Sequence, residues 1–463
     1  MSFPAYPQYQ ESGHDWLGHI PSHWRMVPLK HLCRFEGGGT PDKDRLEYWN
    51  GDVPWVSPKD MGVEYIDRTQ DHITREAVRG SATNMIPANS ILIVARSGIL
   101  RKTIPVAVTR RDVSLNQDMK ALIALDDPVY VMRIIQSHPS ALLVKWRKQG
   151  ATVESLEHER VANSEIPMPP PDEREQILSF LDHETARIDA LIEEQQRLIK
   201  LLREKRQGVV DHAISRGLSH DAPLTASGID DLGEIPSHWE IKRLWHLTPR
   251  HRRIMYGIVL PGPHYEGGIP IVKGGDVAEH RLKLNELSRT TPKIECKYER
   301  SRLRTGDLVY SIRGSIGEVA KIPAELDGAN LTQDAARVAY TESTDGGWLL
   351  FALQANPIFG QLESKAVGAT IRGINIRDLK RALIPVPPLD EQRQIAEFLK
   401  RRISEFQRLE DEAARAISLM TEHRSSLISS AVTGKIDVRS WDRSKSTTEE
   451  ALPQVAEEEG RYG

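Results

Sequence analysis

Two long stretches of the chain carry apolar residues at heptad spacing, and the second stretch repeats the first 218 positions later. In the first stretch these positions are Leu181, Ile188, Ile192, Ile199 and Leu202. The second stretch presents Leu399, Ile403, Phe406, Ile417 and Met420 in the same register. A heptad repeat of this kind is typical of the seam of a coiled coil. We therefore expect two long helices that bury their apolar stripes against each other. An antiparallel pair is the simplest arrangement, because the intervening segment must return the chain.

Proline and glycine mark the ends of both stretches. Each begins just after a proline-rich segment, where Asp172 and Asp390 are the expected N-caps. Gly217 and Gly434 follow the last apolar positions and are expected at the C′ position, where glycine accepts a left-handed backbone. The predicted helices span 172–217 and 390–434, and each is about 65 Å long.

The duplication includes the rest of the chain. The entry motif Ile20-Pro21-Ser22-His23-Trp24 returns as Ile235-Pro236-Ser237-His238-Trp239. The regions between entry motif and helix differ in sequence, yet both contain short β-like runs and a few helical segments. The β-like runs include Ser90–Ala95 and Leu308–Ile312, and the expected helices include Pro128–Gln149 and Trp348–Ser364.

The predicted fold class is α+β, with two tandem α/β domains separated by two long antiparallel helices and related by a pseudo-twofold internal repeat. The expected divisions are a first domain with its entry segment, a central helix, a second domain, a C-terminal helix and a largely disordered tail. Their boundaries are 1–171, 172–217, 218–389, 390–434 and 435–463.

Composition narrows the class of protein. The chain has 463 residues and 39% hydrophobic residues, and it contains no apolar run long enough for a membrane span. Met1–Tyr6 shows no signal-peptide pattern, and the two cysteines, Cys33 and Cys296, make no disulfide framework, so we expect the cytoplasm. The net charge of −3 conceals an excess of Lys and Arg in Glu240–Leu383 and an acidic segment after Ser440.

Catalytic motifs are not found in the sequence. There is no phosphate-binding loop of the G-x-x-x-x-G-K-[ST] type, and no histidine pair with a third ligand, so we predict neither an ATP site nor a metal site. Phe35-x-Gly37-x-Gly39 is similar to a methyltransferase cofactor loop, but Thr40-Pro41 would break the helix that must follow it. Asn356-Pro357-Ile358-Phe359 lacks the second proline of the methyltransferase motif. We expect packing or capping roles for His23 and His238.

Taken in order, the repeated motifs resemble those of the DNA specificity subunit of type I restriction–modification systems. The motifs are Gly18–Trp24 and Gly233–Trp239, Gly38-Gly39-Thr40-Pro41, Trp55-Val56-Ser57, and the helix openings Pro167–Ile177 and Pro385–Ile395. The resemblance extends over nearly the whole chain, to about Val438. The second variable region departs from it by lacking the Gly-Gly-Thr-Pro turn.

This resemblance implies a function and a set of partners. Each variable region would be a target recognition domain that reads one half of an asymmetric, bipartite double-stranded DNA target. The helices would set the spacing and dock two methyltransferase (modification) subunits, which motor-nuclease (restriction) subunits then join. No cofactor is expected in this chain, because S-adenosylmethionine, ATP and Mg would lie on the partner subunits. The chain is expected to be non-catalytic. A non-catalytic coiled-coil scaffold and the specificity subunit of a related fused restriction–methylation system remain the alternatives.

Specific reading of DNA requires Arg or Lys at guanine edges and Asn or Gln at adenine edges, with further basic residues at phosphates. Basic residues in turns are the candidates: Lys59, Arg96, Arg101 and Lys102 in the first region, and Arg252, Arg253, Lys273, Arg313 and Arg372 in the second. Gln117 and Gln333 each precede an aspartate, and for them we expect a structural hydrogen-bonding role.

Overall fold

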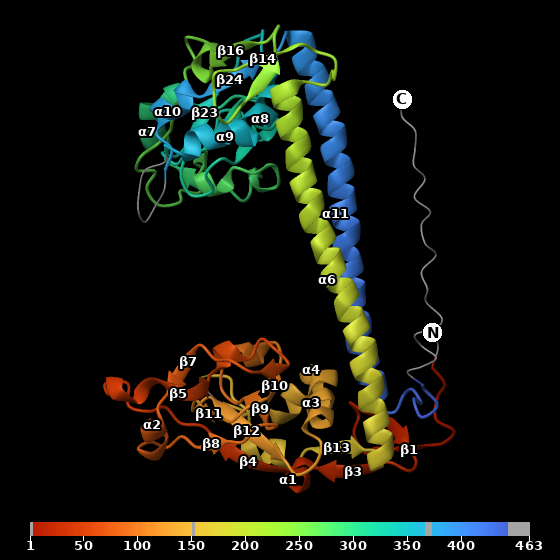
Figure 1. The fold of residues 1–463 in the computed structure, drawn as a ribbon. Helices are drawn as coiled ribbons and strands as arrows, with labels where there is room; N and C mark the ends of the chain where they lie inside the picture. The colour runs from red at the N-terminus through yellow and green to blue at the C-terminus, as the bar shows by residue number, and fades with distance from the viewer. Residues whose placement is uncertain (1–2, 151–152, 366–372, 443–463) are drawn as a thin grey trace. The chain divides into compact units, whose positions relative to one another are not determined.

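The computed structural model describes residues 3–150, 153–365 and 373–442 (Figure 1). The chain divides into two compact units, one formed by Met1–Glu194 with Ala416–Gly463 and the other by Gln195–Arg415. Each unit contains one α/β domain and one part of each long helix. None of the helices in the described ranges is long and apolar enough to cross a membrane.

The two long helices begin slightly earlier than predicted. Helix α6 spans Pro171–Arg216 and helix α11 spans Leu389–Val432. The prediction that Asp172 and Asp390 are N-caps is wrong, because both lie inside the first turn. Pro171 accounts for the earlier start of α6, since a proline at the first helical position has no N–H to leave unpaired. The two aspartates still favour helix formation, because a negative charge near the N-terminus opposes the helix dipole.

Glycine ends both helices as predicted. Gly217 has a φ of +74° and Gly434 a φ of +72°, a backbone conformation that disfavours residues with a Cβ. An added Cβ at Gly217 would press on Trp239, and one at Gly434 would overlap Pro21. Both glycines therefore end a helix and also allow an entry motif to pack against that end.

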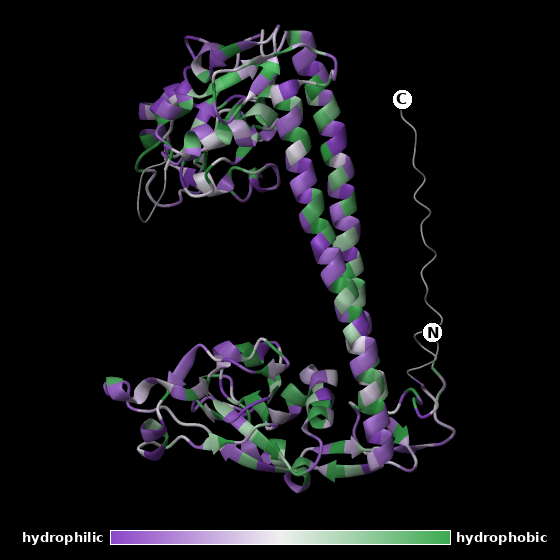
Figure 2. Cartoon of the chain, viewed as in Figure 1, coloured by the Kyte–Doolittle hydropathy of each residue, from purple (hydrophilic) through white to green (hydrophobic). Residues whose placement is uncertain are grey.

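Within each unit the two helix segments run antiparallel, as predicted. In the first unit Arg424 of α11 pairs with Asp189 of α6 at 2.8 Å, and Phe180, nearer the start of α6, contacts Trp441 beyond the end of α11. In the second unit Arg203 pairs with Glu410 at 2.9 Å, while Gly217 at the end of α6 lies beside Glu391 at the start of α11. Figure 2 shows hydrophobic and hydrophilic residues interspersed along both helices, as expected for helices with one apolar stripe.

The predicted seam positions are all at least partly buried. Leu181, Ile188, Leu399 and Phe406 are buried, and the remaining six are half-buried: Ile192, Ile199, Leu202, Ile403, Ile417 and Met420. Five leucines of the same helices lie outside this set and are exposed: Leu191, Leu198, Leu201, Leu409 and Leu419.

The α/β domain of the first unit contains two sheets. One has the strand order β4-β12-β9-β10-β6 and the other β7-β5-β11-β8. Their strands are β4 (Cys33–Gly37), β5 (Trp49–Val56), β6 (Tyr65–Ile66), β7 (Asp71–Ile73), β8 (Met85–Ile86), β9 (Ile91–Val94), β10 (Val106–Thr109), β11 (Val113–Leu115) and β12 (Met119–Ala124). Two further pairs join β1 (Tyr9–Glu11) to β2 (His19–Pro21) and β3 (Arg25–Pro28) to β13 (Glu165–Met168). The helices are α1 (Leu29–Leu32), α2 (Arg75–Arg79), α3 (Pro128–Ser137), α4 (Pro139–Trp146) and α5 (His158–Ala162).

The second domain repeats this plan with fewer strands. Its sheets have the orders β17-β23-β20-β21 and β19-β18-β22. These strands are β17 (Met255–Tyr256), β18 (Ile269–Val272), β19 (Arg289–Thr290), β20 (Leu308–Ser311), β21 (Val319–Lys321), β22 (Asn330–Leu331) and β23 (Ala335–Val338). The further pairs are β14 (Leu224–Ala226) with β15 (Glu234–Pro236), and β16 (Glu240–Arg243) with β24 (Leu383–Val386). The helices are α7 (Pro292–Glu295), α8 (Gly346–Gln354), α9 (Asn356–Glu363) and α10 (Ile376–Arg381).

The internal repeat therefore holds at the level of strand pairing. In the larger sheets β4, β12, β9 and β10 correspond in order to β17, β23, β20 and β21. In the smaller sheets β5 pairs with β11 in parallel, as β18 does with β22. The two predicted single helices are each broken into two, because Pro139 and Pro357 lack the N–H that a continuous helix needs.

A glutamate at the start of each long helix fixes the entry motif. Glu173 is buried and accepts hydrogen bonds from Tyr6 Oη at 2.6 Å and Trp24 Nε1 at 2.9 Å, and its other oxygen lies 2.7 Å from His23 Nε2. In the second unit, the corresponding Glu391 contacts His238 and Trp239. The two histidines therefore hold the entry motifs in place. Burial, followed by the Glu173 hydrogen bond, raises the pKa of Tyr6.

A second polar cluster connects the first domain to its helix segments. Glu64 accepts from Arg133 Nη1 at 2.6 Å and from Arg424 Nη2 at 2.9 Å. Burial alone would raise the pKa of Glu64, but the two guanidinium groups outweigh it and hold the pKa below its ordinary value. Part of the expected disordered tail is packed: Val438 is buried, and the ring of Trp441 contacts that of Phe180 in α6. The rest of that expected tail, residues 443–463, lies outside the described residues.

Candidate nucleic-acid interface

A groove of about 620 Å³ lies at one sheet edge of the first domain. Strands β5 and β11 are parallel, so their carboxyl ends meet at that edge. The single 3₁₀ turn after β5 carries Lys59, and the turn after β11 carries Gln117 and Asp118. Trp49 and Leu46 line the same groove, and Leu46 is 81% exposed.

Arg96 stands beside this groove at the end of β9. Its Nε donates to Asp118 Oδ1 at 2.6 Å, and its side chain is 53% exposed. The backbone N–H groups of Ala95 and Arg96 both donate to the carbonyl oxygen of Asp118. The aspartate therefore fixes both the main chain and the side chain of this arginine.

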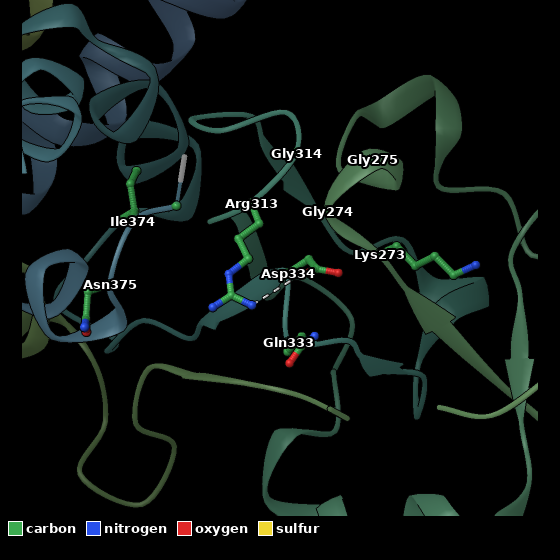
Figure 3. A pocket seen from close by; sticks show the side chains of 10 residues that line it. Lys273, Gly274, Gly275, Arg313, Gly314, Gln333, Asp334, Ile374 and Asn375 are labelled. Atoms are coloured by element: carbon green, nitrogen blue, oxygen red, sulfur yellow. Dashed lines mark ion pairs between the residues drawn. The ribbon is translucent and has the colours of Figure 1, made fainter. Parts of the chain in front are cut away.

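The second domain has a groove of about 650 Å³ in the corresponding place (Figure 3). It is formed where β18 and β22 end, and Lys273 and Gln333 line it. Arg313 follows β20, and its Nη1 lies 4.0 Å from Asp334 Oδ1. The N–H groups of Ile312 and Arg313 both donate to the carbonyl oxygen of Asp334, which repeats the backbone arrangement of the first groove.

The turns after β5 and β18, which line the two grooves, contain the same backbone hydrogen bond to an aspartate. Asp60 accepts from the backbone N–H of Ser57 at 2.8 Å, and Asp276 accepts from that of Lys273 at 2.9 Å. Each domain also brings a glycine against the last residues before its Gln-Asp turn. An added Cβ at Gly38 or at Gly257 would overlap a backbone carbonyl oxygen there, so no larger residue fits.

The loops that leave these glycines are unlike. Residues 40–48 of the first domain include Lys43 and the exposed Leu46, whereas residues 259–266 of the second include Leu260, which is 80% exposed, and the exposed Tyr265. Both loops start next to the Gln-Asp turn, because Thr40 contacts Gln117, and the backbone N–H of Gln333 donates to the carbonyl of Ile258.

Four of the nine predicted basic residues lie at or beside the grooves. Lys59, Lys273 and Arg313 line them, and Arg96 flanks the first. Arg101 and Lys102 follow Arg96 in an exposed turn, with Arg101 Nε 3.9 Å from Glu154. Arg253 is exposed, and its Nε donates to the carbonyl of Arg250. Arg372 lies outside the described residues.

The position of Arg252 in the structure does not agree with the prediction that this residue contacts DNA. Its two terminal nitrogens donate to the two oxygens of Asp307 at 2.7 and 2.6 Å, and both side chains are largely buried. A bidentate buried pair of this kind fixes structure and leaves no guanidinium face for DNA. We therefore remove Arg252 from the candidate set.

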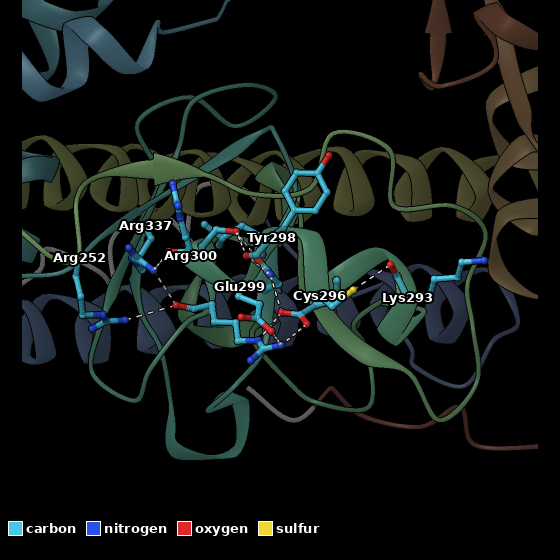
Figure 4. A network of polar contacts seen from close by, with 12 residues as sticks. Arg252, Lys293, Cys296, Tyr298, Glu299, Arg300 and Arg337 are labelled. Atoms are coloured by element: carbon cyan, nitrogen blue, oxygen red, sulfur yellow. Dashed lines mark hydrogen bonds and ion pairs between the residues drawn. The ribbon is translucent and has the colours of Figure 1, made fainter.

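The Arg252 pair belongs to a polar network that stabilises the second domain (Figure 4). Arg337 is buried and donates to the carbonyl oxygens of Arg253, Arg300 and Arg302, and burial lowers its pKa to about 10. Nearby, Arg302 binds both oxygens of the buried Glu295 at 2.6 Å.

The two glutamines differ from each other. The side-chain oxygen of Gln117 accepts from the hydroxyl group of Thr40, which agrees with the structural hydrogen-bonding role expected for this residue. No hydrogen-bond partner is found for the side-chain amide of Gln333 within the described ranges, and this residue lines the groove together with Asn375. Asn375, Trp49 and Leu46 also line the grooves, although they are not among the candidates predicted from the sequence. The only sequence signal for the groove itself is the Gln-Asp recurrence.

Two α/β domains with matched grooves, each attached to parts of two long helices, define a protein formed by duplication of one helix-linked domain. The model of the family "Type I restriction modification DNA specificity domain" matches residues 21–201 and 264–415. These ranges make up more than half of the chain, so the chain belongs to this family.

Named relatives agree with this assignment. The chain is 40% identical to the type I restriction enzyme EcoR124I/EcoR124II specificity subunit of Escherichia coli over 176 residues, which are 37% of this chain and 44% of that relative. It is 24% identical to the type I restriction enzyme MjaIX specificity subunit of Methanocaldococcus jannaschii over 391 residues, which are 80% of this chain and 85% of that relative. The alignment to the EcoR124I/EcoR124II subunit thus spans less than half of that relative's length.

Solved structures share the fold. A chain from a structure solved to explain the assembly and conformational transition of a type I R-M system matches with a TM-score of 0.66 and 18% identity, over 90% of this chain and 99% of that one. The HsdS subunit from Thermoanaerobacter tengcongensis matches with a TM-score of 0.50 and 18% identity, over 92% and 100%.

Proposed function

We propose that the chain is the DNA specificity subunit of a type I restriction–modification complex, and that each α/β domain reads one half of an asymmetric bipartite duplex. The observation that carries this proposal is the pair of matched grooves in two domains of otherwise unlike sequence. Both grooves present Lys and Gln side chains, with an Arg lining the second and flanking the first, and these residue types suit guanine edges, phosphates and adenine edges. Because the groove walls differ, the two half-sites should differ as well.

The two long helices have a different role in this proposal. They hold the two reading domains at a set spacing and dock two methyltransferase subunits, because an internal repeat offers two similar surfaces. Support comes from the five exposed leucines outside the seam, which are apolar surface that the helix pair itself does not bury. The motor-nuclease subunits would join this assembly, and S-adenosylmethionine, ATP and Mg would be bound by the partners.

The test is selection of bound duplexes from a random library by the purified chain, alone and together with the methyltransferase subunit that co-purifies from its host. The proposal predicts two short, unlike base sequences separated by a gap of constant length and no base preference. Enrichment of a palindrome, or of nothing, would contradict it. The second outcome would instead favour a scaffold that binds no DNA.

A matched pair of groove variants sharpens the selection. Lys59→Glu should weaken preference for one half of the target, and Lys273→Glu for the other half, because each lysine lines one groove. If both variants disturb the same half, the assignment of one half-site to each domain is wrong.

A further inference from the structure

The two grooves contain one constellation in common. In each domain an exposed arginine follows a strand of the larger sheet, and its guanidinium group lies near the aspartate of the Gln-Asp turn. These pairs are Arg96 with Asp118, at 2.6 Å, and Arg313 with Asp334, at 4.0 Å. In both pairs the aspartate carbonyl also accepts two backbone N–H groups at the arginine turn. The arginine side chains are 53% and 51% exposed, so both guanidinium groups reach solvent.

The surroundings of this constellation are not shared. Loop 40–48 and loop 259–266 start at the same place beside the Gln-Asp turn, but they differ in sequence and in exposed side chains. If the two domains read different half-sites, a residue pair common to both is suited to a task that does not depend on base sequence. The unlike loops are then the parts that can distinguish bases.

Contact with the phosphate backbone is such a task. In Arg96 the Nε is occupied by Asp118, and no protein partner is found for the two terminal nitrogens in the described part of the chain. A guanidinium group held in this way presents a pair of donors in a fixed direction, which suits the oxygens of a phosphate. Phosphate contacts position a protein on the duplex and carry no sequence information directly.

We propose that Arg96 and Arg313 are matched phosphate anchors, oriented by Asp118 and Asp334, and that loops 40–48 and 259–266 discriminate the bases. This inference rests on the proposed function, because it assumes that each domain binds duplex DNA. It assigns affinity and specificity to different residues of the same groove.

The test compares Arg96→Ala and Arg313→Ala with controls at the opposite sheet edges. Arg110 pairs with Asp67 at 3.7 Å, is 58% exposed, and follows β10, which is antiparallel to β9. Arg304 is exposed and precedes β20, so it lies at the opposite end of that strand from Arg313. Arg110→Ala and Arg304→Ala should therefore remove an arginine of similar exposure without touching either groove.

Binding is measured as a function of salt, on the selected target and on targets with single base changes. Each anchor variant should weaken binding to all these duplexes by the same factor, and the slope of log K against log salt should fall by about one unit. Arg96→Lys and Arg313→Lys should restore most of that slope, and the controls should leave it unchanged. Replacing loop 40–48 should instead change the preferred bases of one half-site and keep the slope.

Three results would overturn the inference. An anchor variant that relaxes preference at one base pair with an unchanged slope would make that arginine a base reader. Anchor variants that keep an intact fold by circular dichroism and bind DNA like the wild type would show that these arginines make no phosphate contact. In both cases the wild type still selects a bipartite target, so the proposed function survives. A wild type without sequence preference would refute the proposed function and this inference with it.

Discussion

Replacing Glu173 should destabilise the first unit more than the matching change at Glu391 destabilises the second. Glu173 has a side-chain exposure of 7% and accepts from the buried Tyr6 and Trp24, whereas Glu391 is 23% exposed and holds one buried donor, Trp239. Each buried donor left without a partner costs about 1–3 kcal/mol. Glu173→Ala should therefore cost about 2–6 kcal/mol and Glu391→Ala about 1–3 kcal/mol.

Hydrogen exchange followed by mass spectrometry can measure both units in one sample. Since 1.4 kcal/mol is about a factor of ten in an opening equilibrium, peptides covering β2 and β3 should exchange roughly 30-fold or more faster in Glu173→Ala. The corresponding peptides over β15 and β16 should respond to Glu391→Ala, and less strongly. Glu173→Gln is the matched control, because its amide oxygen can still accept from Tyr6 and Trp24.

Two outcomes would refute this reasoning. Equal effects of the two alanine variants would show that the additional buried donor contributes nothing. A glutamine variant as damaging as the alanine variant would show that the charge of Glu173, and not its role as an acceptor, holds the entry motif.

Three further predictions follow from the seam, the ion pairs and the absence of catalytic motifs. The double change Ile192→Asp and Ile199→Asp places carboxylates in the half-buried seam. It should therefore lower helicity by circular dichroism and abolish co-purification of the methyltransferase subunit. The control variant, Leu191→Asp with Leu198→Asp at exposed positions, should leave helicity intact. The pKa of Glu64 is lowered on folding, so its stabilisation is present above the ordinary value of 4.5 and is lost as pH falls through the folded value. Melting temperatures of the wild type and Glu64→Gln should therefore converge below about pH 4.5, and a constant difference would argue against this linkage. The isolated chain with labelled S-adenosylmethionine and target DNA should transfer no methyl group, and robust transfer would contradict a binding-only role.

The features that the sequence predicted are those with local signals. The heptads, the glycines at 217 and 434 and the recurring entry motif each depend on residues close together in the chain, and the antiparallel helix segments follow from them. The predicted N-caps were wrong by two positions, because each helix begins one residue before its aspartate and the N-cap lies one residue earlier still. Pro171 can begin a helix as well as precede one.

The features that could not be predicted depend on distant partners. Arg252 was a plausible DNA contact until Asp307, 55 residues further along the chain, proved to hold it. The strand orders of the two domains also depend on residues far apart in the chain. The unlike sequences of the two variable regions gave no indication that these strand orders agree. The groove of the first domain could not be predicted from the sequence, because it forms where parallel pairing brings the turns after β5 and β11 to one edge of the sheet. Gln333 shows the same limit: in the recurring Gln-Asp pattern the side chain of Gln117 contacts Thr40, whereas none of the described residues is a hydrogen-bond partner of the Gln333 side-chain amide.

The central claim is that each α/β domain reads one half of a bipartite target. Methylation profiling of the host genome tests it most directly, with Arg25–Glu165 of this chain replaced by the corresponding region of another family member. The account predicts a methylated motif in which one half is new, while the other half and the length of the gap stay as in the wild type. A motif that changes in both halves, or that does not change at all, would contradict the claim.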